Sequence, residues 1–222
     1  MFIQDKEQIK KFDIQNAKKF VDFWSRYYGK EKIETIEGNN VICYLDELNL
    51  DKGLTGQNVK RLLRWKNHRM LTEKKLSGHN NGQANEKVTQ IIGKLKIINK
   101  FRYGKITENK FKEETKNIFP YGFVMQIFLF HIARPFEYPI ADSNVFLAYS
   151  VHKQEKIPND WDRYKDYREY FFEIVKSAKI ITEKPKGNED TVKDIVAGLK
   201  KVDNALFAFG KFLNFYGKNE LS

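Results

Sequence analysis

The sequence predicts an all-α fold. Apolar residues recur at helical spacing in several segments of the 222-residue chain, whereas the alternating pattern of half-buried strands is scarce. No internal repeat and no sustained heptad pattern is visible, which argues against a solenoid or a coiled coil. Hydrophobic residues make up 41% of the chain and aromatic residues 14%, enough for one sizeable core or two small lobes. This composition excludes a disordered protein.

The first half of the chain predicts three helices and one ambiguous segment. Amphipathic helices are expected over 9–29 and 88–98, and a basic helix with an apolar stripe over 59–70. The apolar centre of the segment 39–49, NNVICYLDELN, is too short for periodicity to separate a strand from a buried helical turn, and we favour the helical interpretation. The polar run SGHNNGQANE at 77–86 indicates a loop or a lobe boundary.

The second half predicts a buried helix followed by two more helices. Residues 101–122 read as turn, short helix and turn, and the almost wholly apolar FVMQIFLFHIA at 123–133 is a central helix that ends before Pro135. An aromatic-rich helix at 164–178 and a last helix at 191–216 follow, with a loop between them.

The chain is strongly basic. Forty Lys and Arg against twenty-nine Asp and Glu give a formal net charge of +11, a positive potential that favours polyanionic partners, nucleic acid first. A general basic bias of composition is the alternative, because the chain is rich in Lys, Asn, Ile and Phe.

Cysteine and hydropathy patterns indicate a cytoplasmic protein. Cys43 is the single cysteine, so an internal disulfide and a multi-thiolate metal site are excluded, and the four histidines show no zinc-binding spacing. No apolar run approaches the roughly 20 residues that span a bilayer. The segment MFIQDKEQIKKFD carries charges where a signal peptide is apolar, so we expect neither export nor a membrane partner.

The segment YPIADSNVFLAY, residues 138–149, places a carboxylate before an apolar helix. Asp142 is a good N-cap there, because its oxygens can accept the amide hydrogens of the first helical turn. By itself, this position indicates a structural role.

The surroundings of Asp142 resemble the helix-hairpin-helix DNA glycosylases, which include the adenine glycosylases and endonuclease III. Residues 118–122, Ile-Phe-Pro-Tyr-Gly, stand for the family's hairpin, 123–133 for its buried helix, and 139–145, Pro-Ile-Ala-Asp-Ser-Asn-Val, for the segment with the catalytic aspartate. The interval from Ile118 to Asp142 matches without a gap. The resemblance covers about residues 86–150.

This resemblance implies a two-lobed helical fold and a catalytic carboxylate. The chain would be a single glycosylase-like unit over 1–222, in which helices from 1–80 and 151–222 complete two lobes around 86–150. Asp142 would stabilise the positive charge that develops on the sugar as the N-glycosidic bond breaks. Asn144 would orient Asp142 or contact a backbone phosphate.

The hairpin implies a phosphate grip, because a tight turn entering a helix presents unpaired amides to an anion. Pro120 stands at the first glycine position of the family's hairpin, and Gln126 replaces a small residue. A turn that merely joins two core helices is the alternative. The resemblance also leaves room for a monovalent cation at the hairpin. The predicted DNA contacts here are Tyr121, Gly122, Phe123, Val124 and Ser143.

The chain lacks two features that some members of the family have, and this restricts the reaction that the resemblance implies. Bifunctional members carry a nucleophilic lysine 18 residues before the aspartate, and here that position is Val124, which cannot form a Schiff base. The resemblance therefore implies a monofunctional enzyme that uses water. One cysteine cannot hold the iron-sulfur cluster of some relatives, so no such cofactor is expected.

The remaining site residues come from the first half of the chain. Glu47 lies at a separation from Asp142 similar to that of the acid that protonates adenine in the family. Tyr44 and Trp65 lie where a base pocket would be built, although aromatic residues at such spacing are commonly core. Arg61, Arg64 and Arg69 are expected either to contact phosphates or to form a solvated face.

Three functions therefore stay open. The first is a monofunctional, monomeric DNA N-glycosylase of base excision repair acting on duplex DNA, nucleoid-associated if prokaryotic. The second is a catalytically inactive DNA-binding protein of the same fold, and the third is a helical protein-interaction domain in which Asp142 is only a cap.

Overall fold

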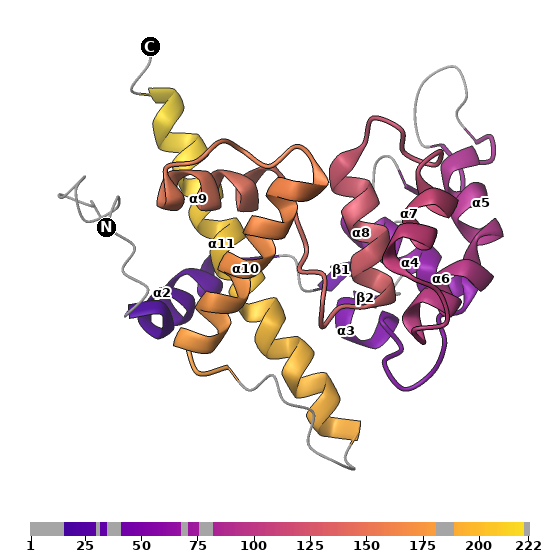
Figure 1. The fold of residues 1–222 in the computed structure, drawn as a ribbon, viewed down its shortest axis with the longest axis horizontal. Coiled ribbons are helices and arrows are strands. Elements are labelled where there is room, and N and C mark those ends of the chain that lie inside the picture. Colours follow the sequence, from indigo (N-terminus) through magenta and orange to yellow (C-terminus); the bar gives the residue numbers. More distant parts are fainter. Residues whose placement is uncertain are drawn as a thin grey trace. The chain divides into compact units, whose positions relative to one another are not determined.

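The chain is helical, as the sequence predicts. A computed structural model describes residues 16–29, 32–34, 41–67, 71–75, 82–180 and 189–219 (Figure 1). The named strands in the described ranges form a small antiparallel ribbon, β1 (Lys32–Glu34) with β2 (Val41–Cys43). The chain forms two compact units, which are described separately: unit 1 combines residues 1–29 with 138–222, and unit 2 is the continuous segment 30–137.

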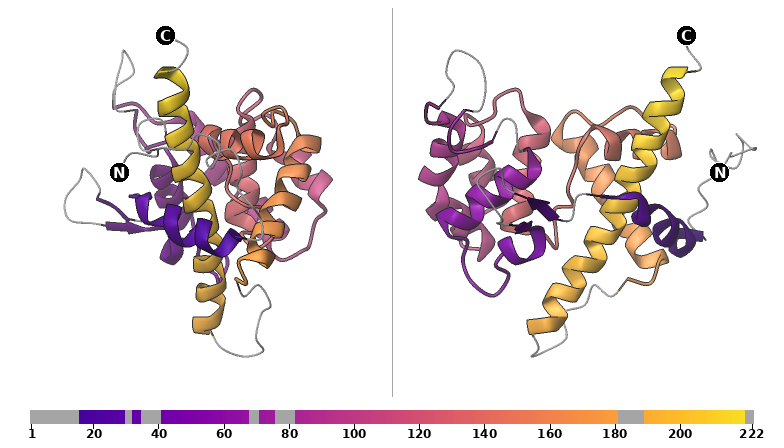
Figure 2. Two further views of the ribbon diagram at one scale, coloured as in Figure 1. Left: turned by 90° about the vertical axis from the view of Figure 1, so that its left-hand side faces the viewer. Right: turned by 180° about the vertical axis from the view of Figure 1, so that it is seen from behind.

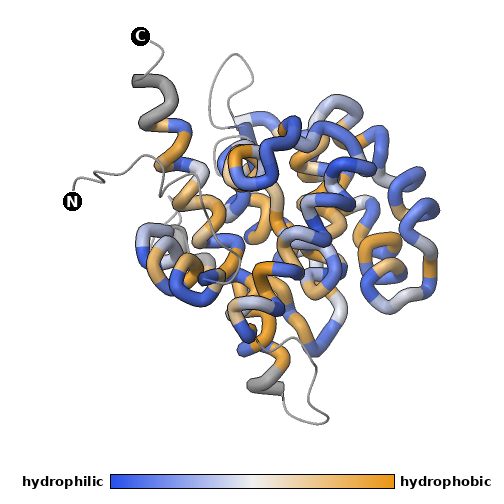
Figure 3. The backbone as a smooth tube through the Cα atoms, turned by 60° about the vertical axis from the view of Figure 1, so that its left-hand side comes forward, coloured by the Kyte–Doolittle hydropathy of each residue, from blue (hydrophilic) through white to orange (hydrophobic). Residues whose placement is uncertain are grey.

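Unit 1 is built around its longest helix. Helix α11 packs most extensively against α9 and also contacts α2 and α10. The views in Figure 2 show α11 passing α2, and Figure 3 shows hydrophobic and hydrophilic stretches alternating along it, as expected of an amphipathic helix. The helices of the unit are α2 (Ala17–Trp24), α9 (Ser143–Lys153), α10 (Trp161–Ser177) and α11 (Glu189–Asn219), and a 3-10 turn at 25–27 follows α2.

Unit 2 surrounds an apolar central helix. In α8, all residues from Ile127 to Ala133 are buried, which confirms the central helix predicted over 123–133. The rings of Phe101 and Phe111 stack with centroids 4.3 Å apart, and Phe130 of α8 contacts both rings edge-on. The helices are α3 (Tyr44–Glu47), α4 (Gly56–Lys66), α5 (Glu86–Gly93), α6 (Leu95–Arg102), α7 (Glu108–Thr115) and α8 (Phe123–Ala133).

Two local predictions were wrong. Segment 39–49 was expected to be helical, but 41–43 form strand β2, paired with β1, before α3 begins at Tyr44. The pairing partner lies nearly ten residues upstream, beyond the reach of local periodicity. The helix predicted over 88–98 is two helices, because the chain turns at Lys94, whose amide bonds to the Ile91 carbonyl at 3.0 Å.

The other predicted elements hold within small shifts of their ends. Helix α2 lies in the predicted range 9–29, of which residues 9–15 are outside the described part. Residues 77–81 of the polar break predicted at 77–86 lie outside the described part, and the break falls within unit 2. Next to it, Lys74 and Ala84 form a bridge and Asn85 caps α5. The two last helices begin earlier than predicted, at Trp161 and Glu189.

Arg102 ties three parts of unit 2 together. Its guanidinium donates to the carbonyls of Leu48 and Asn49, at 2.8 and 2.7 Å, and to the carbonyl of Ile132 at 3.3 Å. These carbonyls lie just past the end of α3 and near the end of α8, where helices leave acceptors without a partner and favour a positive charge. Burial lowers the pKa of Arg102 below its usual value. The side chain therefore fastens two helix ends to α6.

Replacing Arg102 by Met should lower the free energy of unfolding by about 2–4 kcal/mol, because three carbonyls lose a charged donor. Arg102→Lys should recover part of this loss, since one ammonium cannot reproduce the planar fork. Lys100→Met on the same helix is the matched control and should change stability by less than about 0.5 kcal/mol. Urea denaturation followed by circular dichroism measures all three, and equal stability of R102M and K100M would refute the role of Arg102.

Candidate functional site

Asp142 is the N-cap of α9, as the sequence predicts. Its backbone is extended, and a single carboxylate oxygen, Oδ1, accepts the amides of Asn144 and Val145 at 2.9 and 3.0 Å. Its carbonyl accepts the amide of Phe146 as the first bond of the helix. One oxygen thus satisfies two amides that have no partner inside the helix.

The other carboxylate oxygen is not used by the fold. Asp142 is half-buried, and none of the described residues donates a hydrogen bond to Oδ2. Asn144 is also half-buried, and its side-chain amide makes no hydrogen bond within the described part of the chain. Ser143, between them, is exposed. The carboxylate is therefore held rigidly by Oδ1 while Oδ2 retains its acceptor capacity.

Helix α10 holds the segment that leads into Asp142. The residues from Tyr138 to Ala141 are buried. The Tyr164 hydroxyl donates to the Pro139 carbonyl at 2.8 Å, and the Tyr167 hydroxyl donates to the Ile140 carbonyl at 3.2 Å. Two buried carbonyls of an irregular segment thereby obtain donors, which fixes the backbone just before the carboxylate.

The hydroxyl of Tyr167 stays protonated. Burial raises its pKa well above the usual value, and the nearby carboxylates of Asp203 and Asp142 add to this shift. Asp203 is itself buried and accepts from Lys200 at 2.5 Å, and Lys200 also lies 4.1 Å from the ring centroid of Tyr28. Asp203 thus belongs to a buried ion pair of α11.

A glycine lets α11 approach the start of α9. A Cβ atom on Gly210 would lie 1.8 Å from the carbonyl oxygen of Asn144, a distance that no side chain tolerates. The backbones of the two helices are therefore in direct contact two residues after Asp142. Two helices therefore fix the N-terminus of α9: α10 holds the segment before Asp142, and α11 contacts the backbone at Asn144.

The predicted hairpin is a tight turn between α7 and α8. The Gly122 amide bonds to the Phe119 carbonyl at 3.1 Å, and the order Pro120, Tyr121, Gly122 is typical of a type I turn, with proline second and glycine fourth. The side chain of Gln126 donates to the same carbonyl at 2.6 Å. The two departures from the family pattern, Pro120 and Gln126, therefore both stabilise this turn.

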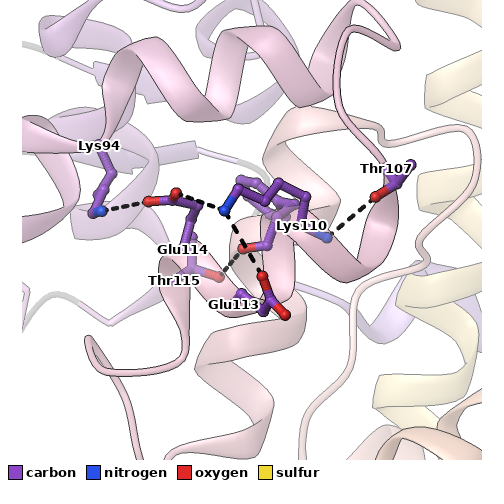
Figure 4. Close-up of polar contacts among 7 residues, drawn as sticks. Lys94, Thr107, Lys110, Glu113, Glu114 and Thr115 are labelled. Carbon is purple, nitrogen blue, oxygen red and sulfur yellow. Dashed lines mark hydrogen bonds and ion pairs between the residues drawn. The ribbon is translucent and has the colours of Figure 1, made fainter.

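The N-terminus of α8 carries no side-chain cap. Within the described residues the Val124 amide has no acceptor, so the helix opens with at least one unpaired donor. The helix before the turn is held by ion pairs: Figure 4 shows Glu114 between Lys94, at 2.8 Å, and Lys110, at 3.4 Å, and the Thr107 side chain capping α7. These contacts fix helix α7, which leads into the turn.

The basic residues predicted on α4 are engaged with carboxylates. Arg61 lies 3.0 Å from Glu47, and Arg64 lies 3.3 Å from Glu73, which also pairs with Lys60 at 2.6 Å. These hydrogen-bonded charges lower the pKa of Glu73, Lys60 first. Arg69 lies outside the described residues. Much of the positive charge of this helix is compensated inside unit 2.

The other residues predicted from the first half of the chain are buried in unit 2. Glu47 accepts from Arg61 through Oε1 and from Asn58 at 3.2 Å through Oε2, so each carboxylate oxygen already has a donor. Tyr44 and Trp65 pack with ring centroids 4.6 Å apart, and the Tyr44 hydroxyl bonds to His131. These aromatic rings form core contacts in the structure.

The sequence did not single out three residues that position Asp142: Tyr164, Tyr167 and Gly210. The tyrosines lie three residues apart on an aromatic-rich helix, a pattern that predicts core packing and not a particular carbonyl acceptor. A lone glycine inside a helical pattern was the available signal for Gly210, because such a residue often marks close packing.

No family model, curated protein or solved structure matches the chain. In the described ranges, no group of three or more His, Cys, Asp or Glu is arranged to hold a metal ion. None of the described helices has the length and apolar character needed to cross a membrane.

Substituting Gly210 by Ala should destabilise unit 1 by at least about 2 kcal/mol, because the new methyl group forces α11 away from the Asn144 carbonyl. The control is Gly93→Ala at the end of α5, where a Cβ meets no atom within 4 Å, and it should be neutral or slightly stabilising. Thermal melts of both variants test the contact. A G210A protein as stable as G93A would show that the two helices do not meet at this point.

Proposed function

We propose that the chain is a monofunctional DNA N-glycosylase with a helix-hairpin-helix glycosylase-like fold, which removes a damaged or modified base. The observation that carries the proposal is the state of Asp142: one oxygen is fixed by the amides of Asn144 and Val145, and Oδ2 remains an acceptor for a ligand. Two tyrosine hydroxyls also hold the backbone just before Asp142, so its carboxylate is fixed in place.

The chemistry asks for a fixed anion next to the deoxyribose. As the bond from C1′ to the base nitrogen breaks, its electron pair leaves with the base and positive charge spreads over C1′ and the ring oxygen. A carboxylate held in place stabilises this charge without having to reorganise during the reaction. Asp142 would supply this carboxylate, and Asn144 would orient the substrate or contact its phosphate.

Water would complete the reaction. A water molecule adds its oxygen to C1′ and loses a proton to solvent, while the departing base nitrogen takes up a proton, so the products are an abasic site and the free base. Val124 at the family's lysine position supports hydrolysis without strand cleavage, because valine offers no nucleophile. Glu47 is a poor candidate for the proton donor, because both of its carboxylate oxygens already bind Arg61 and Asn58.

Unit 2 would bind the DNA backbone. It has twenty Lys and Arg against twelve Asp and Glu, so it carries +8 of the chain's net charge of +11. The open N-terminus of α8 behind a rigid turn suits a phosphate oxygen, with the Val124 amide as a donor. A DNA substrate also accords with a cytoplasmic, nucleoid-associated protein.

A DNA-binding protein without catalysis is the second candidate. The concentration of charge in unit 2 favours it, because that charge supports DNA binding whether or not Asp142 acts on a sugar. The two candidates differ in base release alone, so the test must remove the charge of Asp142 without disturbing the helix that it caps.

Asp142→Asn should abolish base release and leave the fold intact. Asparagine caps helices as well as aspartate, so the melting temperature should shift little, but the neutral side chain cannot stabilise an oxocarbenium-like sugar. Asp160→Asn is the matched control, because Asp160 caps α10 of the same unit through the Arg163 amide at 2.9 Å. Duplexes with a panel of damaged or modified bases are incubated with each protein, and abasic sites are cleaved with alkali.

The wild type and D160N should release a base from at least one duplex, and D142N should be slower by about 10²-fold or more. Strand cleavage should require the alkali treatment. Retained DNA binding with no base release from any duplex would establish the binding protein, and equal activity of D142N and D160N would show that Asp142 is only a cap.

A further inference from the structure

The apex of the α7–α8 turn displays an aromatic ring that the fold does not use. Tyr121 is 99% exposed, the highest exposure among the large hydrophobic side chains of the described residues. It makes no hydrogen bond or ring contact with any of them. Its ring therefore contributes no packing energy to the folded state and keeps its whole surface for a ligand.

The backbone beneath this ring is rigid. The Phe119 carbonyl accepts both from the Gly122 amide and from the Gln126 side chain, and proline precedes Tyr121. A Cβ atom added at Gly122 would lie only 3.2 Å from the Cβ atom of Phe119, so the turn is closely packed. A tyrosine on such a turn loses only its two side-chain torsions when it binds, which keeps the entropic cost of stacking low.

Two lysines lie near the turn, Lys116 at the end of α7 and Lys87 beside the ring of Phe119. From Lys87 to Lys116 the chain carries nine Lys and Arg against three Asp and Glu. Lys116, at the end of α7, is exposed, and Lys87 lies 5.9 Å from the ring centroid of Phe119. Neither lysine forms an ion pair with the described residues, in contrast to Arg61 and Arg64 of α4.

We propose that Tyr121 stacks on an unpaired or extruded base of DNA while the neighbouring lysines neutralise its phosphates. A protein partner would require a contiguous apolar patch, but the large hydrophobic side chains exposed in the described part of unit 2 are Tyr121 and Tyr103 alone. One aromatic ring among unpaired lysines fits a stacked base on a polyanion instead. The inference rests on the DNA binding of the proposed function and adds the preferred form of DNA: a duplex with a base out of the stack.

The test compares two labelled duplexes of equal length and charge, one fully paired and one with a single unpaired base, by fluorescence anisotropy at several salt concentrations. The wild type should prefer the duplex with the unpaired base by about tenfold, and Tyr121→Ala should lose this preference. Tyr121→Phe should keep it, because the ring and not the hydroxyl stacks. The slope of affinity against salt should be the same for all three proteins, since none of these changes alters charge.

Two control variants separate stacking from other effects. Tyr103→Ala removes the other exposed tyrosine of unit 2, which is 54% exposed, and should leave the preference unchanged. Lys116→Ala should weaken binding to both duplexes alike and reduce the salt slope. Because Tyr121 is fully exposed, Y121A should have the same melting temperature as the wild type.

The outcomes separate this inference from the enzymatic proposal, which is scored by base release from the panel above. Equal affinity of Y121A and wild type for both duplexes overturns the stacking role even if the protein releases a base. Loss of the preference in Y121A supports stacking even if no base is released. A wild type that binds neither duplex at low salt overturns both proposals.

Discussion

The position of Asp142 depends on one contact above all others, the direct approach of α11 to the start of α9. Gly210 brings its backbone against the Asn144 carbonyl, where any side chain would collide. Since Asp142 caps the same turn of α9, this contact sets where its carboxylate lies. The hydroxyls of Tyr164 and Tyr167 complete the constraint from α10 by holding the two residues at 139–140. Together these contacts from α10 and α11 fix the backbone around Asp142.

Sequence reasoning could recover the parts of this arrangement that local patterns encode. The apolar run of α8 and the cap at Asp142 follow from spacing and residue type, and the structure confirms both. The strand β2 and the break at Lys94 were missed, because strand pairing and a turn between two helices depend on contacts outside any short window. The acceptors of the tyrosine hydroxyls are likewise 25 and 27 residues away in the chain.

The ion pairs seen in the structure changed the interpretation of the basic residues. From the sequence alone, Arg61 and Arg64 are as good candidates for a phosphate contact as any other exposed cation. In the structure they pair with Glu47 and Glu73, whereas Lys116 next to the α7–α8 turn has no carboxylate partner among the described residues. Net charge predicts the class of partner, but the pairing of each cation decides where that partner is held. The turn with Tyr121 thereby becomes the stronger candidate for a DNA contact than α4.

The central claim is that a fixed anion faces a sugar that becomes cationic, and it can be tested without knowing which base is removed. The measurement is the affinity for duplexes that carry, at one position, either a cationic pyrrolidine analogue of the abasic sugar or its neutral tetrahydrofuran counterpart. The wild type should bind the cationic analogue more tightly by at least about tenfold, and this difference should vanish in D142N. Equal affinity of the wild type for the two analogues would contradict the claim.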